Sequence, residues 1–338
     1  MVSLKDIAQK CGVSIATVSK SLNDLNDVSV ETKERIKQVA REMGYFPNSS
    51  ARALKTNRTH NIGVLFVDQS QSGLTHDYFA QVLDSFKRTV ELRGYDITFI
   101  NSTHNNGMTY LEHSRYRGVD GIVIACVDFS DPQIIELVNC DIPVVTIDHV
   151  FDYRIAVLSD NIQGMHDLVE YAYAKGHRKI AYITGEDTMV TRNRVGSFIR
   201  SLEKHLVVTP DEYIKKSSYR NPDKAYMFTK ELLNLKNPPT LILYPDDYSA
   251  VGGYNALRDE GLKVPDDISI LGYDGSYISQ IISPKLTTLK QNTEEIGKVS
   301  AGKLIHLIEN PKTTLIQRLV IDGMLLEGES VADIRMYE

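Results

Sequence analysis

The sequence lacks the features that mark secreted, membrane and metal-binding proteins. Its three cysteines, Cys11, Cys126 and Cys140, form neither a paired framework nor a cluster, so we expect reduced thiols and no bound metal. No stretch approaches the roughly 18 consecutive apolar residues of a membrane span. The N-terminus has neither the basic nor the apolar region of a secretory signal. These absences predict a soluble protein of the cytoplasm that makes no membrane contact.

The motifs of several enzyme classes are also missing. No Gly-x-Gly-x-x-Gly follows a predicted strand, and no Gly-x-x-x-x-Gly-Lys-Ser/Thr phosphate loop or Gly-x-Ser-x-Gly elbow occurs. The nine histidines are scattered and do not have the spacing of a metal site. The sequence therefore predicts a protein that is not an enzyme and carries no cofactor.

Charge is present but unevenly distributed along the chain, whose net charge is −6. Residues 1–60 contain ten Lys or Arg and six Asp or Glu, which gives +4, whereas the remaining residues contain 28 basic and 38 acidic side chains, which gives −10. A positive N-terminal segment can hold DNA phosphates, while an acidic remainder is repelled by the duplex.

Residues 4–44 show the pattern of a helix-turn-helix. A first helix has one apolar face, formed at helical spacing by Leu4, Ile7, Ala8 and Cys11. Gly12 suits the left-handed conformation that ends such a helix, Ser14 can cap a second helix, and Val18 can pack inward. A third helix is expected from Ser29 to Met43. An ordinary three-helix bundle is the alternative, but the spacing of Ala8, Gly12 and Val18 matches the tight turn of a DNA-reading motif.

The predicted DNA contacts lie in the second helix and in a short segment after the third. In this motif the N-terminal turns of the second helix touch base edges, which assigns Ser14, Ile15, Ala16, Thr17, Ser19, Lys20 and Asn23. The segment from Pro47 to Leu54 is too short to be a stable helix by itself, and it ends in a lone apolar wedge suited to the minor groove. From this segment we assign Asn48, Ala51 and Leu54.

Beyond residue 60 short β-branched runs alternate with amphipathic stretches, which is typical of parallel sheets with helices on both faces. Strands are predicted at residues 62–67, 96–100, 121–126, 144–147, 179–184, 240–244 and 269–273. Helices are predicted at residues 78–93, 161–175, 192–205, 222–234, 248–260 and 293–308. Because so many strands exceed one sheet of typical size, we expect an α/β body with two lobes.

Three segments carry a resemblance to a known family. The run from Leu4 to Lys20, the junction Gly44-Tyr45-Phe46-Pro47-Asn48 and the segment Ala51-Arg52-Ala53-Leu54 closely resemble the lac repressor and gal repressor (LacI/GalR) family of transcriptional regulators, and the likeness continues to the end of the chain. It implies that Ile15, Ala16 and Lys20 face the major groove and that Leu54 enters the minor groove at the centre of the operator. The family more often has arginine at the position of Lys20. Since an ammonium group is a more mobile contact than a planar guanidinium, the operator sequence stays open.

The resemblance also implies a domain organisation. Residues 1–46 would form the helix-turn-helix domain, residues 47–60 a hinge helix and linker, and residues 61–338 an effector-binding and dimerisation domain that resembles a periplasmic sugar-binding protein. In such a body the chain crosses between the lobes three times, here near Asp160, Gln291 and Leu319. The lobe nearest the DNA would contain residues 61–160 and about 291–319, and the distal lobe would contain about 161–290 and 320–338.

Carboxylates recur where predicted strands end, which is where ligands bind in open α/β sheets. Carboxylates accept hydroxyl hydrogens and aromatic faces cover the apolar side of a sugar ring, so the composition favours a mono- or oligosaccharide. The predicted effector contacts are Tyr78, Phe79, Asp148, Asp160, Arg194, Tyr219, Asp246 and Asp274. By the resemblance, Arg194 and Asp274 match effector-contacting residues, Tyr78 with Phe79 matches an aromatic pair, and Asp246 stands where many members have asparagine.

Several of these residues have structural alternatives. Asp160 and Asp246 can cap the helices that follow them, Phe79 can pack in a helix core, and Asp148 with His149 can fix the hinge between the lobes. Asp247, which lies beside a helix start, is assigned to capping.

Together these observations predict a ligand-responsive transcription factor, most simply a repressor, that binds a palindromic operator as a homodimer. The stretch after Glu327 is far too short for the several heptads of a tetramerising helix. The alternatives are a transport-type sugar-binding protein with unrelated N-terminal helices, and a regulator that responds to a purine or to a phosphorylated partner protein. The identity of the effector, and the choice between induction and corepression, stay open.

Overall fold

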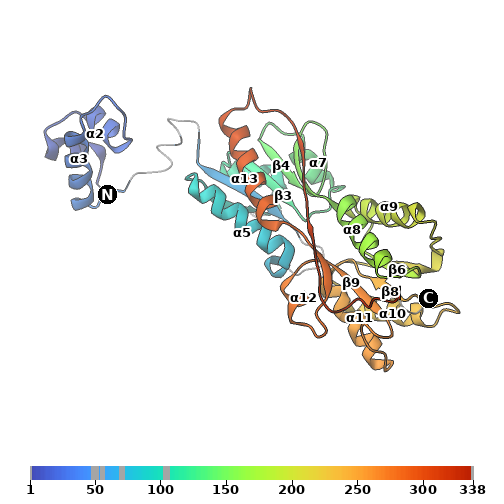
Figure 1. Ribbon diagram of the computed structural model, residues 1–338. Helices are drawn as coiled ribbons and strands as arrows, with labels where there is room; N and C mark the ends of the chain where they lie inside the picture. The colour runs from blue at the N-terminus through green and yellow to red at the C-terminus, as the bar shows by residue number, and fades with distance from the viewer. Residues whose placement is uncertain (1, 47–52, 54–57, 68–72, 102–106, 336–338) are drawn as a thin grey trace. The chain divides into compact units, whose positions relative to one another are not determined.

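The computed structural model describes residues 2–46, 53, 58–67, 73–101 and 107–335. The chain divides into two compact units, Met1–Thr59 and His60–Glu338 (Figure 1). We call the first unit the head and the second the body. The predicted DNA contacts Asn48, Ala51 and Leu54 lie outside the described residues.

The head is built from three helices, α1 (Leu4–Cys11), α2 (Ile15–Leu22) and α3 (Val30–Glu42). Each follows a serine whose hydroxyl accepts a bond from the backbone N–H three residues later: Ser3, Ser14 and Ser29. Helix α1 ends at Gly12, whose φ of 66° is left-handed, so a tight turn leads into α2. The residues buried between the three helices are Ile7, Ala8, Val18, Ile36 and Ala40.

Within the described residues the body contains two six-stranded sheets. Sheet 1 has the order β11-β5-β4-β3-β1-β2, and all its pairs are parallel. Its strands are β1 (Asn61–Phe66), β2 (Asp96–Ile100), β3 (Gly121–Ala125), β4 (Val144–Ile147), β5 (Ile155–Ser159) and β11 (Arg318–Ile321). In the register, Ile62 faces Gly121 on β3 and Ile97 on β2.

Sheet 2 has the order β12-β10-β9-β8-β6-β7. Its strands are β6 (Ile180–Thr184), β7 (Ile214–Lys216), β8 (Leu241–Leu243), β9 (Ser269–Asp274), β10 (Thr287–Lys290) and β12 (Met324–Leu326). The short strand β12 runs antiparallel to β10, and the other pairs are parallel. The two parallel-sheet lobes and the helical head confirm the predicted fold class.

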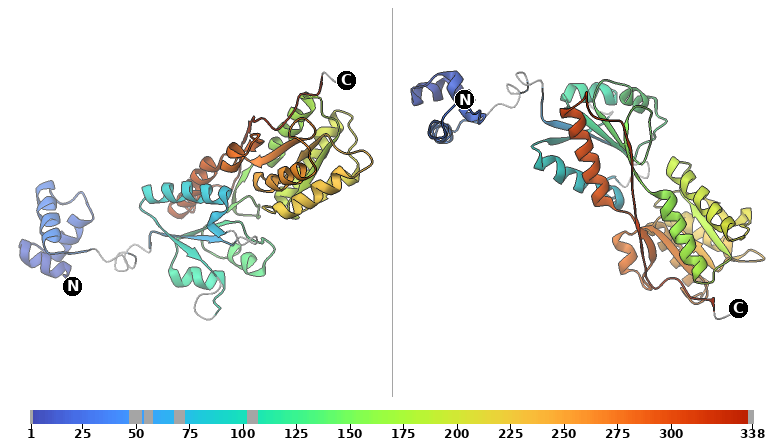
Figure 2. Two further views of the ribbon diagram at one scale, coloured as in Figure 1. Left: turned by 90° about the horizontal axis from the view of Figure 1, so that it is seen from below. Right: turned by 45° about the horizontal axis from the view of Figure 1, so that its top comes forward.

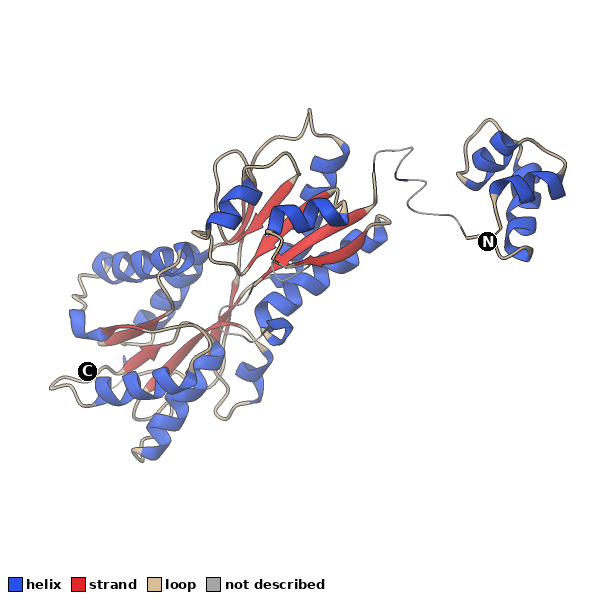
Figure 3. Cartoon of the chain, turned by 180° about the vertical axis from the view of Figure 1, so that it is seen from behind, coloured by secondary structure: helices blue, strands red, loops and turns tan. Residues whose placement is uncertain are grey.

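Helices cover both faces of each sheet, as Figure 3 shows. Lobe 1 consists of sheet 1 with α5 (Asp77–Leu92), α6 (Tyr110–Arg117), α7 (Pro132–Val138) and α13 (Thr293–Glu309). Lobe 2 consists of sheet 2 with α8 (Asn161–Ala174), α9 (Met189–Lys204), α10 (Pro222–Leu233), α11 (Asp247–Asp259) and the short α12 (Tyr277–Ile281). Single 3-10 turns lie at Gly73–Thr75 and Asp211–Tyr213.

Each lobe has two apolar cores, one on each face of its sheet. In lobe 1, α5 and α13 lie side by side over one face, in all views of Figures 1 and 2, and α6 with α7 covers the other. In lobe 2, α8 and α9 cover one face and α10 and α11 the other. Because buried parallel strands are covered on both sides, they present nearly continuous apolar runs such as 121–125.

The chain crosses between the lobes after β5, after β10 and after β11. The first crossing lies beside Asp160 and the second beside Gln291. The third, predicted near Leu319, comes after Ile321, because Val320 and Ile321 still pair with Leu158 and Ser159 of β5. The chain therefore leaves lobe 1 at residues 322–323. No described helix is long and apolar enough to cross a membrane.

Candidate functional site

Loops at the carboxyl ends of strands from both sheets enclose a cavity of about 200 Å³. Parallel strands bring these ends to one edge of each sheet, which is where α/β folds bind ligands. Six of the eight predicted effector residues line the cavity: Tyr78, Phe79 and Asp148 from lobe 1, and Arg194, Tyr219 and Asp274 from lobe 2.

Arg194 lies on the second turn of α9 and is only 3% exposed. Its Nε donates to Asn161 Oδ1 over 2.7 Å, and its Nη1 donates to the carbonyl oxygen of Pro245 over 2.9 Å. The guanidinium carbon also lies 3.4 Å from the centroid of the Tyr273 ring, which is cation–π distance. These contacts fix the guanidinium in one orientation at the wall of the cavity.

Asp274 is the last residue of β9, and its φ of 104° lies in the region that favours glycine. Its Oδ1 accepts a bond from Gln291 Nε2 over 2.6 Å. Burial raises the pKa of Asp274 to about 7, although the charge of Arg194 acts in the opposite direction. Near neutral pH this carboxyl therefore exists in both protonation states, and it can either accept or donate a hydrogen bond to a ligand.

The lobe 1 wall is organised around the pair Tyr78 and Asp148. The Tyr78 hydroxyl donates to Asp148 Oδ2 over 2.5 Å, and Asp148 Oδ1 accepts from the backbone N–H of Ser159 over 2.9 Å. Burial raises the pKa of Asp148 above its ordinary value. Phe79 packs edge-on against Phe66 and also lines the cavity.

A flat aromatic surface completes this wall. The rings of Phe129 and His149 stack with their centroids 4.0 Å apart and an interplanar angle of 6°. Burial lowers the pKa of His149, which keeps its imidazole neutral at physiological pH. His149 thus lines the cavity and is not only a hinge residue.

Two predicted effector residues lie outside the cavity wall, as helix caps. Asp160 accepts bonds from the backbone N–H groups of Ile162 and Gln163 at the start of α8. Asp246, 2% exposed, accepts from the N–H of Ser249 over 2.7 Å and so caps α11. Capping satisfies N–H groups that the helix itself leaves unpaired, and this role competes with ligand contact for the same oxygens.

Asp247, assigned to capping, has another role. It is buried, and its carboxylate accepts bonds from Ser276 N over 2.6 Å and from Thr288 Oγ1 over 2.6 Å. It therefore ties the loop after β9 to β10, and the helix cap is its neighbour Asp246. The prediction was wrong by one residue, because α11 begins at Asp247 itself and the capping residue is the one before the first helical residue.

Several cavity residues escaped the sequence assignment, among them His76, Phe129, Glu186 and Gln291. Glu186 carries a usable signal, since it follows strand β6 closely, and its Oε2 accepts from the N–H of Tyr219 over 3.0 Å. Gln291 lies at a crossing between the lobes, where no local pattern marks a side chain as part of a cavity.

In the head, the predicted DNA contacts of α2 lie mostly at the surface. Ser14, Ile15, Ala16, Lys20 and Asn23 are exposed, whereas Thr17 and Ser19 are half-buried. The Ser14 hydroxyl accepts from the N–H of Thr17 over 3.0 Å, so this serine is engaged in capping. The Lys20 ammonium pairs with Asp27, a contact that competes with its predicted contact to DNA.

Comparison with known proteins identifies both units. Residues 3–48 match the model for bacterial regulatory proteins of the lacI family, and residues 169–331 match the periplasmic binding protein-like domain. The chain is 32% identical to the probable HTH-type transcriptional repressor ExuR of Bacillus subtilis (strain 168), over 93% of each chain. The chain belongs to the LacI family.

Further relatives extend this result over the whole chain. The HTH-type transcriptional repressor PurR of Escherichia coli O139:H28 is 28% identical over 98% of each chain. The lac repressor dimer bound to operator and the anti-inducer ONPF superposes with a TM-score of 0.82 at 24% identity, covering 98% of this chain and 99% of that one. A LacI family regulator from Enterococcus faecium with bound ribose gives a TM-score of 0.70 at 25% identity, covering 81% of this chain and 100% of that one. This LacI family member is thus a DNA-binding transcriptional repressor and not an enzyme, which decides against the transport-type alternative.

Proposed function

We propose that this repressor binds a near-palindromic operator as a homodimer, and that a sugar held in the cavity between the lobes sets its operator affinity. The observation that carries the effector part is the composition of the cavity wall. Arg194 and Asp274 offer a donor and an acceptor for hydroxyl groups, and Tyr78, Phe129 and His149 offer aromatic surface. Together these groups match a pyranose or furanose ring, which has hydroxyls at its edge and an apolar face.

The size of the cavity favours a monosaccharide. Its volume of about 200 Å³ lies below the roughly 300–1,000 Å³ of pockets for drug-sized ligands. The Enterococcus faecium relative, whose structure contains ribose, supports the same class of ligand.

The effector acts through the angle between the lobes. A sugar that contacts Asp148 in lobe 1 and Arg194 or Asp274 in lobe 2 stabilises one lobe angle at the expense of others. Only a difference in its affinity for the two states can shift their populations. The sign of the response, induction or corepression, is given by whether operator affinity falls or rises when the sugar is added.

A thermal-shift screen tests the effector. The full-length protein is mixed with D-ribose, D-glucose, D-galactose or cellobiose, and in parallel with adenine or guanosine. We expect one sugar to raise the melting temperature, and we expect Asp274→Ala to lose this shift. Asp259→Ala is the matched control, since Asp259 is a lobe 2 carboxylate at the end of α11 outside the cavity lining. A shift with a purine compound alone contradicts the sugar assignment and leaves the regulator intact.

An operator-binding assay tests the DNA contacts. In the full-length protein, Lys20→Ala and Leu54→Ala should each weaken binding to a genomic upstream fragment, because one removes a major-groove contact and the other the predicted minor-groove wedge. Lys298→Ala, an exposed change on α13 of the body, is the control. Binding as tight as wild type in both head variants contradicts these assignments.

A further inference from the structure

Two of the crossings between the lobes carry a buried side-chain amide. Asn161 follows β5 and is 5% exposed, and Gln291 follows β10 and is 4% exposed. Asn161 Oδ1 accepts from Arg194 Nε over 2.7 Å, and Gln291 Nε2 donates to Asp274 Oδ1 over 2.6 Å. The two amides therefore hold the guanidinium and the carboxyl of the cavity at the places where the chain changes lobe.

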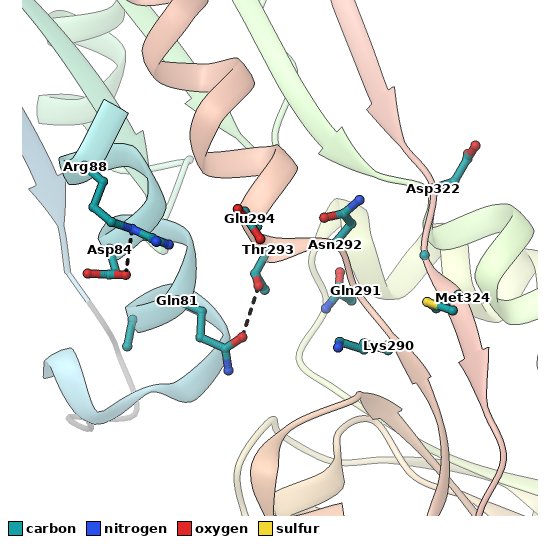
Figure 4. A pocket seen from close by; sticks show the side chains of 12 residues that line it. Gln81, Asp84, Arg88, Lys290, Gln291, Asn292, Thr293, Glu294, Asp322 and Met324 are labelled. Atoms are coloured by element: carbon teal, nitrogen blue, oxygen red, sulfur yellow. Dashed lines mark hydrogen bonds and ion pairs between the residues drawn. The ribbon is translucent and has the colours of Figure 1, made fainter. Parts of the chain in front are cut away.

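Both crossings are also bonded to lobe 1. Asn161 Nδ2 donates to the carbonyl oxygen of Ser159 over 3.0 Å, and the N–H of Ser159 donates to Asp148. At the second crossing, Thr293 Oγ1 donates to Gln81 Oε1 on α5 over 3.0 Å. Figure 4 shows this second path, along a groove of about 770 Å³ that Gln291 also lines. Arg194 is thus connected to lobe 1 through Asn161, and Asp274 is connected to it through Gln291 and the nearby Thr293.

Gln291 leaves part of its hydrogen-bonding capacity unused. Among the described residues, its Oε1 is buried and accepts no bond. Since a buried acceptor without a partner is costly, a lobe arrangement that supplies a donor is favoured over this one. Gln291 Nε2 is bonded to Asp274, and Oε1 belongs to the same amide group. An effector hydroxyl placed beside Asp274 would therefore be near Oε1 and could donate to it.

We propose that Asn161 and Gln291 are positioning residues that couple the occupancy of the cavity to the lobe angle, and so to operator affinity. This proposal rests on the proposed function. It goes beyond ligand binding, because it concerns the ratio of the operator dissociation constants with and without effector. Couplings of this kind are typically about 5- to 150-fold.

The test measures the ratio of operator dissociation constants with and without sugar separately from the affinity for the sugar. Gln291→Met and Asn161→Leu remove the amides and nearly preserve side-chain volume, whereas Asn161→Asp keeps an acceptor for Arg194. Gln133→Met is the matched control, because Gln133 on α7 has a buried Oε1 without a partner among the described residues but lies outside the cavity lining. Operator affinity is measured by fluorescence anisotropy with and without the one sugar among D-ribose, D-glucose, D-galactose and cellobiose that most stabilises the wild type. Calorimetry gives the affinity for that sugar.

In Gln291→Met and Asn161→Leu we expect this ratio to move towards one by about tenfold, or to reach one where sugar changes the wild-type operator affinity by less than tenfold. Gln133→Met should keep the wild-type ratio. Asn161→Asp keeps the acceptor for Arg194 but loses the Nδ2 donor to Ser159, so its ratio should lie between those of wild type and Asn161→Leu. A purely structural role would lower the melting temperature and weaken operator binding equally with and without sugar, which leaves the ratio unchanged. An unchanged ratio in both amide variants, with sugar still bound, overturns the proposal alone. If no sugar stabilises the wild type, the effector part of the proposed function is wrong and this proposal falls with it.

Discussion

Asp274 is the residue at which the electrostatics of the cavity can be measured. Burial raises its pKa to about 7, and a sugar hydroxyl donates more strongly to the ionised than to the protonated form. Affinity for such a sugar should therefore increase with pH up to about 7 and then level off, by at most about tenfold per unit below that value because the protonated carboxyl still offers a hydrogen bond. Calorimetric titrations between pH 5.5 and 8.5 measure this, and Asp274→Asn should abolish the dependence. An equally steep rise in that variant assigns the titration to another group.

The same shift has a consequence for stability. A folded-state pKa above the unfolded value of about 3.9 means that the folded protein holds the proton more tightly. The stabilisation from protonated Asp274 is complete below pH 3.9 and is lost as the pH rises towards 7. Asp274→Asn should therefore gain stability relative to wild type between pH 5 and pH 7.5, by roughly 2 kcal/mol. Urea unfolding at both pH values checks this, and a difference that is the same at both contradicts it.

Lys20 is a predicted DNA contact that forms an ion pair within the head. It pairs with Asp27, and both side chains are about half exposed, so the pair itself contributes little to stability. Asp27→Asn should free the ammonium and remove a negative charge near the DNA, which should strengthen operator binding severalfold. Lys20→Ala should weaken it by about 1–3 kcal/mol if the contact is to a base. Anisotropy titrations at two salt concentrations distinguish a base contact from a phosphate contact, because a lost phosphate contact reduces the salt slope by about one.

The sequence predicted the kinds of side chain in the cavity more accurately than the individual residues that line it. Strand-end position selected Asp148 and Asp274, the family resemblance pointed to Arg194, and all three line one cavity in the structure. Strand-end position also selected Asp160 and Asp246, whose oxygens are occupied by helix N–H groups. A strand-end carboxylate has the same local sequence in both roles, and only the direction in which the following helix starts decides between them.

At the level of secondary structure, two helical glycines differ in what surrounds them. A Cβ on Gly252 of α11 would lie 1.9 Å from the carbonyl oxygen of Pro222, the first residue of α10, whereas on Gly196 of α9 the nearest atom is 3.7 Å away. Gly252→Ala should therefore force α10 and α11 apart and cost about 1–3 kcal/mol or more. Gly196→Ala should stabilise by about 0.5–1 kcal/mol, because alanine loses less conformational entropy in a helix. Urea unfolding of both variants tests the opposite signs, and destabilisation by Gly196→Ala would show a contact not present in the structure.

The elements predicted from sequence have a strong apolar pattern, although β5 (Ile155–Ser159), which is buried and apolar, was missed. The seven predicted strands and six predicted body helices are present with ends shifted by up to three residues, since buried strands and amphipathic helices have distinct periodicity. The missed elements include β11 and β12, whose side chains are mostly exposed or half-buried. Helix α6, which mixes charged with apolar residues around its circumference, was also missed. Such elements are held by their neighbours in the sheet or lobe, which a local pattern does not record.

At the scale of the whole molecule, the two units differ both in net charge and in predicted role. The head carries the positive balance and the α2 surface, while the body carries the negative balance and the cavity. The lobes are joined by the chain crossings after β5, β10 and β11, of which two bear amides bonded to cavity residues. A ligand held between such lobes shifts their angle where it binds one arrangement more tightly than another, and the residues that line the cavity share contacts with those that join the lobes.

The predicted homodimer has a candidate surface on lobe 2. Helix α11 contacts both α10 and α12. These three helices carry four large, exposed apolar side chains: Met227 at 60%, Tyr248 at 40%, Tyr277 at 75% and Ile281 at 60%. Exposed apolar side chains on helices that pack together are a candidate interaction surface. A second copy of the chain, related by a two-fold axis, would cover them and provide the second head that a palindromic operator requires.

Replacing Tyr277 and Ile281 together by lysine should therefore produce a monomer, because two copies would bring like charges together in the interface. Operator affinity should fall by about 100-fold or more, since linking two heads gains about 10²–10⁴ in effective concentration, while sugar binding within one chain should be retained. Leu206→Lys is the control, because Leu206 is 92% exposed just beyond α9 and is not part of α10–α12. Sedimentation velocity at micromolar concentration measures the assembly. A double variant that still sediments as a dimer places the interface elsewhere, and a stable tetramer in the wild type contradicts the dimer itself.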